Sequence, residues 1–193
     1  MDALFGIMSA FGLSASAGLN AYIPLLVVGV IAHYTTWIKL TPPYDLLANP
    51  WILILVGVLL IVEMLADKVP AVNHINDIIQ TVFRPAAGAI VFAASAHALT
   101  GVHPVLALAC GLLVAGSIHT VKSAAIRPAV TATTGGAGNV PVSVAEDAIA
   151  TAVSILSIVI PVLIAVLLLV FVVLIIWWLW RRANRKRQAA SYK

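Results

Sequence analysis

Long apolar runs make up most of this chain, and short stretches rich in polar residues, glycine or proline separate them. The runs cover residues 3–33, 51–69, 84–99, 104–121 and 143–180. About 20 apolar helical residues span the hydrocarbon core of a bilayer, so each run predicts a membrane helix. The pattern predicts an all-α membrane protein, a bundle of five or six transmembrane helices with broken or re-entrant segments.

The first and last runs are longer than one membrane span requires. As one helix, residues 3–33 would be about 45 Å long, which fits either a tilted helix or two half-helices broken near Gly18. The last run would reach about 57 Å and is expected to project beyond the membrane or to kink at Pro161. Residues 34–50 indicate a loop, and residues 73–83 an interfacial helix that precedes a short span starting at Arg84.

Residues 127–147, RPAVTATTGGAGNVPVSVAED, interrupt the apolar pattern most strongly. Gly135, Gly136 and Gly138 lie in this stretch with two prolines. Non-helical backbone at membrane depth is tolerated only where protein or a water-filled cavity satisfies its N–H and C=O groups. Because successive N–H groups of a glycine-rich turn can form an anion-binding nest, this stretch is the candidate site.

Composition supports the membrane assignment. The chain is 62% hydrophobic and 9% charged, with a mean hydropathy of +1.08. Six of the eleven Lys and Arg residues lie in the last thirteen positions, directly after Trp177, Trp178 and Trp180. We interpret residues 1–181 as one transmembrane domain and residues 182–193 as a basic cytoplasmic tail, a membrane-topology signal that argues against nucleic-acid binding.

Two sequence echoes suggest an internal repeat. Residues 57–68 (GVLLIVEMLADK) align without gaps with residues 111–122 (GLLVAGSIHTVK), and an Arg-Pro-Ala triplet follows each segment. In addition, SASAG at residues 14–18 resembles TATTG at residues 131–135. If the chain is a duplication, the broken segments of the two halves are expected to meet near the membrane midplane, where repeat-built transporters bind substrate.

Four basic residues outside the tail and the first loop are candidates for anion binding. Lys68, Arg84, Lys122 and Arg127 are all expected on one side of the bundle. A charge at membrane depth costs about 3 kcal/mol on insertion scales and so needs a partner or a function. The alternative is that Lys68 pairs with Asp67 or Asp77 and that all four cations reach the interface by snorkelling.

Acidic and amide side chains complete the predicted site. Glu63 and Asp67 lie four residues apart, on one helix face, and are candidates for proton or cation coupling, with a buried hydrogen-bonded carboxyl as the alternative. Residues 143–146 (SVAE) match a capping box, so Glu146 is expected to cap the last helix. Asn20 and Asn139, at the two breaks, are expected to orient a substrate.

Motifs of metal sites and hydrolases are absent from the sequence. His97, His103 and His119 do not have the spacing of a metal site, and Cys110 is the single cysteine. Residues 122–128 only partly match the first motif of membrane lipid phosphatases, and no nucleophile motif follows. We therefore expect no cofactor and, more readily than an enzyme, a protein without catalytic residues.

Three segments together resemble a known family: SASAGLNAYIP, EMLADKVPAVNHINDIIQTVFRPAAGAI and HTVKSAAIRPAVTATTGGAGNVPVSVAED. They are similar to small bacterial integral-membrane proteins whose family carries only a domain-of-unknown-function label. The resemblance covers nearly all of the chain before the basic tail. It implies a multi-pass protein of the bacterial inner membrane and gives no substrate or site residues.

The sequence predicts a transporter or channel for a small or lipid-linked anion, with possible proton or cation coupling. The alternatives are a membrane-embedded hydrolase of phosphorylated lipids and a non-catalytic membrane assembly protein. Expected partners are membrane lipids, a small anionic solute or a lipid head group, and further copies of the chain in a homo-oligomer, with no nucleic acid. The predicted anion-binding residues are Asn20, Lys68, Arg84, Lys122, Arg127, Gly135, Gly136 and Asn139, and the predicted coupling residues are Glu63 and Asp67.

Overall fold

The computed structural model describes residues 3–68, 70–100, 102–160, 166–167, 169–178 and 180–181, without the side chains of residues 3, 4, 70–75, 77 and 97–100. Within these ranges the regular structure is helical, which confirms the all-α class. The elements are α1 (Ala3–Leu19), α2 (Tyr22–Tyr34), η1 (Tyr44–Ala48), α3 (Pro50–Ala66), α4 (Pro70–Thr100), α5 (Pro104–Val121), η2 (Lys122–Ile126), α6 (Arg127–Thr134) and α7 (Asn139–Val159).

Three helical segments of the described chain are long and apolar enough to cross a membrane. They are Ile78–Ala96 within α4, Pro104–Thr134 through α5, η2 and α6, and Asn139–Val159 in α7. Together with the composition, they indicate an integral membrane protein. The shorter apolar helices α1, α2 and α3 pack beside them, so a count of five or six spans stays a prediction.

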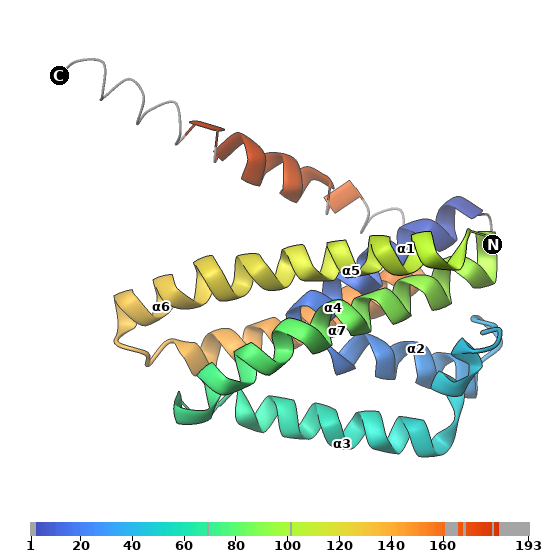
Figure 1. Cartoon of the computed structure of the whole chain (residues 1–193), viewed down its shortest axis with the longest axis horizontal. Coiled ribbons are helices and arrows are strands. Elements are labelled where there is room, and N and C mark those ends of the chain that lie inside the picture. The colour runs from blue at the N-terminus through green and yellow to red at the C-terminus, as the bar shows by residue number, and fades with distance from the viewer. Residues whose placement is uncertain are drawn as a thin grey trace.

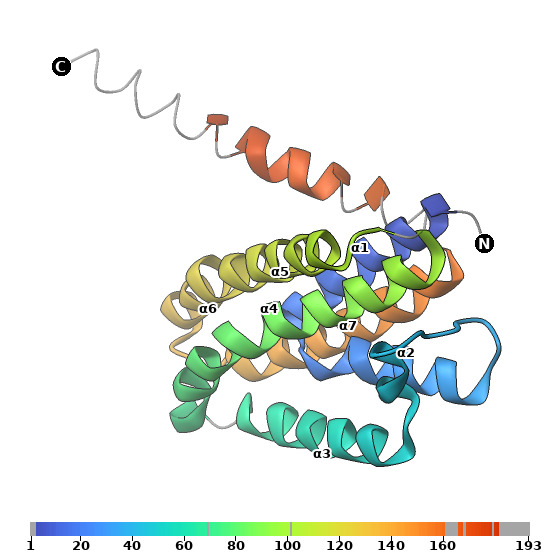
Figure 2. The same cartoon turned by 45° about the vertical axis from the view of Figure 1, so that its right-hand side comes forward.

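The first two helices form a hairpin, which we call the α1–α2 hairpin. Figures 1 and 2 show that α1 runs from the N-terminal end of the bundle into its middle and that α2 turns back toward the same end. The break falls at Asn20 and Ala21, just beyond Gly18, and both residues are buried. At 17 and 13 residues, α1 and α2 are about 25 and 20 Å long, so neither alone spans a hydrocarbon core of about 30 Å.

Serine hydroxyls join the hairpin to α5 and α7. Ser9 donates to the carbonyl of Ser157, and Ser16 donates to that of Ala150, so α1 lies antiparallel to α7. Ser14 donates to the carbonyl of Gly111 in α5. Each hydroxyl is satisfied inside the bundle, as a low-dielectric interior requires.

Small residues bring α4 and α5 into close contact. A Cβ atom built at Gly88 would collide with the side chain of Ala115, and one at Gly111 would collide with the carbonyl of Gly88. Such approaches of backbone to backbone are typical of membrane helix interfaces, where small residues favour dispersion contacts. The core around them contains Leu13, Ala17, Val91 and Ala115.

The prediction of a separate interfacial helix at residues 73–83 was wrong. These residues and the predicted span from Arg84 belong to one helix, α4, with Pro85 in its interior. The sequence Arg84-Pro85 had indicated a boundary, but proline is tolerated inside membrane helices where neighbouring helices support the backbone. Pro85 packs beside Gly116 of α5.

The interruption predicted at residues 127–147 is also much shorter than expected. Helix α5 continues through the π-helical turn η2 into α6, and α7 begins at Asn139. The non-helical part is the turn at residues 135–138, where Gly135 and Gly136 have positive φ angles of 61° and 92°. The turn is largely exposed, and Gly135 serves as the left-handed C-cap that ends α6.

Several predictions fall on parts of the chain that the structure does not describe. Pro161, the basic residues 182–193 and the side chains of Asp77 and His97 lie outside the described residues. The kink, the domain boundary at residue 181 and the cytoplasmic tail therefore stay predictions, as does the internal repeat.

Candidate functional site

Six charged side chains converge inside the bundle, and we call them the ion network. Its members come from α3, α4, η2, α6 and α7, and each is at most 7% exposed. Three close pairs define it. Arg84 Nη2 lies 2.9 Å from Glu63 Oε1, Arg127 Nη2 lies 2.8 Å from Asp67 Oδ2, and Lys122 Nζ lies 2.8 Å from Glu146 Oε2.

Asp67 is the centre of the ion network. Its Oδ2 atom lies within 4 Å of three cationic groups, at 2.8 Å from Arg127, 3.7 Å from Arg84 and 3.9 Å from Lys122. The hydroxyl of Ser143 donates to the same oxygen at 3.3 Å, and the amide of Asn76 donates to Oδ1 at 2.7 Å. Both carboxylate oxygens of Asp67 are therefore held by donors.

The surroundings of Asp67 favour its ionised form. The charges of Arg127, Lys122 and Arg84 and the amide of Asn76 all stabilise a carboxylate at this position.

Local helix geometry explains how the residues reach the ion network. Glu63 and Asp67 lie one turn apart at the C-terminal end of α3 and share a face. Lys122 is the first residue of η2 and Arg127 follows its last residue. The backbone N–H of Arg127 donates to the carbonyl of Lys122. This i→i+5 bond of a π-helix brings residues five positions apart to the same face, which a regular α-helix would not do.

The tip of the α1–α2 hairpin is bonded to residues of the ion network and of α7. Lys122 Nζ donates to the carbonyl of Leu19 at 2.9 Å, which places a cation at the C-terminal end of α1. Asn20 accepts from the N–H groups of Tyr22 and Ile23 and thereby caps α2. Its amide donates to Asp147 Oδ1 at 2.9 Å. The unwound tip is satisfied by protein groups.

A histidine extends the network along α4 and α5. His119 Nδ1 lies 3.3 Å from Arg84 Nη1, and His119 Nε2 lies 3.1 Å from the Thr81 hydroxyl. Because a guanidinium group can only donate, Nδ1 accepts and Nε2 carries the proton that reaches Thr81. His103 instead caps the N-terminus of α5, and no group of three potential ligands that could hold a metal occurs among the described residues.

Some buried oxygen atoms near the ion network have no partner in the described part of the chain. They are Glu63 Oε2, Glu146 Oε1, Asp147 Oδ2 and Gln80 Oε1. A buried carboxylate oxygen without a donor is costly, and protonation is one way to remove that cost. The first three atoms are therefore positions where a proton can be held.

The predicted site residues separate into two groups. Arg84, Lys122 and Arg127 meet Glu63 and Asp67 in the ion network, with Asn20 beside it. The glycine turn does not join them, because α6, about 12 Å long, separates Arg127 from Gly135. Asn139 bonds with Thr131 next to this turn, and Lys68 is partly exposed after Asp67.

The prediction that Glu146 belongs to a capping box was wrong. Glu146 is instead a member of the ion network. Helix α7 begins at Asn139, so Ser143 and Glu146 lie inside it. Both side chains turn to the network, where Ser143 contacts Asp67 and Glu146 pairs with Lys122. Two adjacent carboxylates in a largely apolar helix, Glu146 and Asp147, were the signal that could have identified Glu146.

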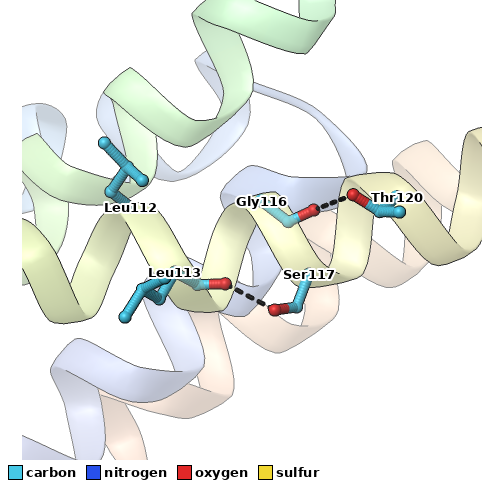
Figure 3. Close-up of a pocket in the computed structure, with 5 residues that line it drawn as sticks. All are labelled: Leu112, Leu113, Gly116, Ser117 and Thr120. Atoms are coloured by element: carbon cyan, nitrogen blue, oxygen red, sulfur yellow. Dashed lines mark hydrogen bonds between the residues drawn. The ribbon is translucent and has the colours of Figure 1, made fainter.

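A surface groove on α5 is separate from the ion network. It has a volume of about 450 Å³ and is lined by Leu112, Leu113, Gly116, Ser117 and Thr120 (Figure 3). The two hydroxyls donate to carbonyls of their own helix, at Leu113 and Gly116. Both hydroxyl protons are thus used within α5, and the lining residues offer no charged side chain, so we do not assign an anionic substrate to this groove.

Comparison with known proteins agrees with the family resemblance seen in the sequence. No curated protein and no solved structure matches the chain. Residues 7–181 match the model of a protein family described as Domain of unknown function (DUF4126), and the chain therefore belongs to this family.

Proposed function

We propose that the protein is a membrane transporter for a small anion and that anion movement is coupled to protons at the ion network. The observation that carries this proposal is the burial of three cations and three carboxylates within helices of an integral membrane protein. Ionisable residues at membrane depth are costly, and they typically mark substrate pathways and proton relays.

Charge balance explains why protons and anions would move together. With a proton on Asp147 Oδ2, the remaining carboxylates Glu63, Asp67 and Glu146 neutralise Arg84, Lys122 and Arg127. A free anion then has no net attraction to the network. Protonation of Glu63 or Glu146 removes one negative charge and leaves one cation uncompensated. An anion then replaces the lost charge, and release of the proton expels it.

The unpartnered oxygens support this assignment of roles. Among the described residues, no donor reaches the buried atoms Glu63 Oε2 and Glu146 Oε1, whereas both oxygens of Asp67 are bonded. Glu63 and Glu146 are therefore better proton carriers than Asp67, while Arg84, Lys122 and Arg127 bind the anion. Asn20 holds the hairpin tip that Lys122 contacts.

Flux measurements test the proposal. The purified protein is reconstituted into vesicles that contain a pH-sensitive dye, and chloride, nitrate, lactate or inorganic phosphate is added outside. We expect at least one anion to drive proton uptake above the level of protein-free vesicles. The double variant Glu63→Gln/Glu146→Gln, which lacks both proposed proton carriers, is expected to carry that anion without the proton, whereas the exposed-site variant Asp45→Asn retains both. Absence of flux with every anion would overturn the proposal and favour a structural role in membrane assembly.

A further inference from the structure

We infer that the position of the Asp67 carboxylate is itself an anion-binding seat, which the chain fills with its own side chain. The matching ligand class is a small, singly charged oxyanion the size of a carboxylate. This inference rests on the proposed function, because it identifies the cations and neutral donors that the ion network offers to a transported oxyanion.

The contacts of Asp67 are those of a bound ligand. Its two oxygens receive the guanidinium of Arg127 at 2.8 Å, the amide of Asn76 at 2.7 Å and the hydroxyl of Ser143 at 3.3 Å. Arg84 and Lys122 lie within 4 Å of Oδ2. The donors come from α4, η2, α6 and α7 and thus surround the carboxylate.

The other two carboxylates of the ion network are held less completely. Glu63 receives both of its bonds from Arg84, through one oxygen, and Glu146 likewise uses one oxygen for Lys122 and Arg127. Their second oxygens have no partner among the described residues. Among the described residues, Asp67 is therefore the network carboxylate with a donor on each oxygen: Oδ2 faces the cations and the Ser143 hydroxyl, and Oδ1 accepts from the Asn76 amide. Such convergent donors are the arrangement that recognises a free oxyanion.

Alanine can replace Asp67 without a change in the backbone conformation. Asp67 follows the last residue of α3 and has helical dihedral angles of −66° and −21°, which alanine also adopts. In Asp67→Ala the backbone can stay in place while the carboxylate group is removed. The network then has two carboxylates against three cations, and a buried cation without a counter-charge is strongly unfavourable.

Chemical rescue by formate tests the seat. We expect the Tm of Asp67→Ala in detergent to lie roughly 5–10 °C below that of the parent when gluconate is the only anion. Formate, at equal ionic strength, should restore most of this loss with a saturable dependence on concentration. The larger anion benzoate should restore much less.

Matched variants separate a seat from a general salt effect. Asp67→Asn has nearly the same shape but fills the seat with a neutral amide, so its Tm should fall without rescue by formate. Parent and Asp45→Ala should have the same Tm in formate and gluconate. If Asp67→Ala does not fold, Asp67→Ser provides the same test with a smaller loss of contacts.

The results discriminate between the seat and the transport proposal. Equal responses of the Ala and Asn variants to formate would overturn the seat, even if the parent carries anions. Selective rescue of the Ala variant would establish the seat, even if the parent shows no anion flux in vesicles.

Discussion

Arg84 donates two hydrogen bonds to the same oxygen of Glu63, Oε1, from Nε at 3.3 Å and from Nη2 at 2.9 Å. The side chains are 0% and 1% exposed, so water does not screen the pair. Removing one member of a buried pair leaves an uncompensated charge, whereas removing both leaves none. This asymmetry distinguishes a buried pair from a surface salt bridge.

The effects of truncating Arg84 and Glu63 on the free energy of unfolding should be strongly non-additive. We expect Arg84→Met to lower the free energy of unfolding by roughly 3–5 kcal/mol, because Glu63 loses its principal partner. Adding Glu63→Leu to that variant should recover part of the loss. Denaturant titration in detergent measures all three variants, and a double variant whose cost equals the sum of the single costs would contradict a coupled pair.

Charges in an apolar chain are informative because their burial is costly, and this is why much of the ion network could be predicted. Arg84, Lys122 and Arg127 stand out in apolar helices, and the four-residue spacing of Glu63 and Asp67 places them on one face. Their convergence follows from long-range packing and from the π-turn at Lys122–Ile126, which has no simple sequence signal. The sequence therefore indicated the chemical groups but not their mutual neutralisation.

Two predictions failed because local patterns competed with tertiary contacts. Ser143 and Glu146 fit a capping box, yet the glycine turn had already set the start of α7 at Asn139. Pro128 and the threonines of residues 127–134 indicated an interruption of the helix, but Pro128 lies in the first turn of α6, where proline is favoured. The anion nest proposed at Gly135 depended on proximity to the cations, which only the fold could reveal.

Substitutions at two glycines should change stability in opposite directions, because Gly88 lies in the close contact of α4 and α5 and Gly57 in α3 does not. A Cβ at Gly88 would collide with Ala115 and lie 2.9 Å from the Ser14 hydroxyl, whereas one at Gly57 meets no atom within 4 Å. We expect Gly88→Val to cost about 1–3 kcal/mol through overpacking. Gly57→Ala should gain up to about 1 kcal/mol from helix propensity. Thermal unfolding in detergent compares them, and equal effects would show that the helices do not pack at Gly88.

The two asparagines predicted to orient a substrate should differ in their importance. Asn20 is 1% exposed, caps α2 and holds Asp147, whereas Asn139 is partly exposed and bonds Thr131. Asn20→Ala loses a helix cap and leaves a carboxylate without its donor, so we expect a cost of roughly 2–4 kcal/mol. Asn139→Ala should cost less than about 1 kcal/mol. Denaturant titration of both variants is the measurement, and a larger effect at Asn139 would place the important break at the glycine turn.

The direction of the α1–α2 hairpin gives a topology that a single tilted helix does not. The start of α1 and the loop at residues 35–49 lie at one end of the bundle, and the turn at residues 135–138 lies at the other (Figures 1 and 2). Cysteines placed at the exposed positions Thr36 and Ala137, in a Cys110→Ala background, report the two sides through a membrane-impermeant maleimide.

We expect whole cells to label only one of these cysteines before permeabilisation, and an N-terminal epitope tag to be accessible on the side of Thr36. Two half-helices require this result, because the chain enters and leaves at the same face. If α1 and α2 formed one continuous span, the tag would instead appear on the side of Ala137. That outcome would remove the buried tip at Asn20, and with it the backbone carbonyl of Leu19 that Lys122 binds.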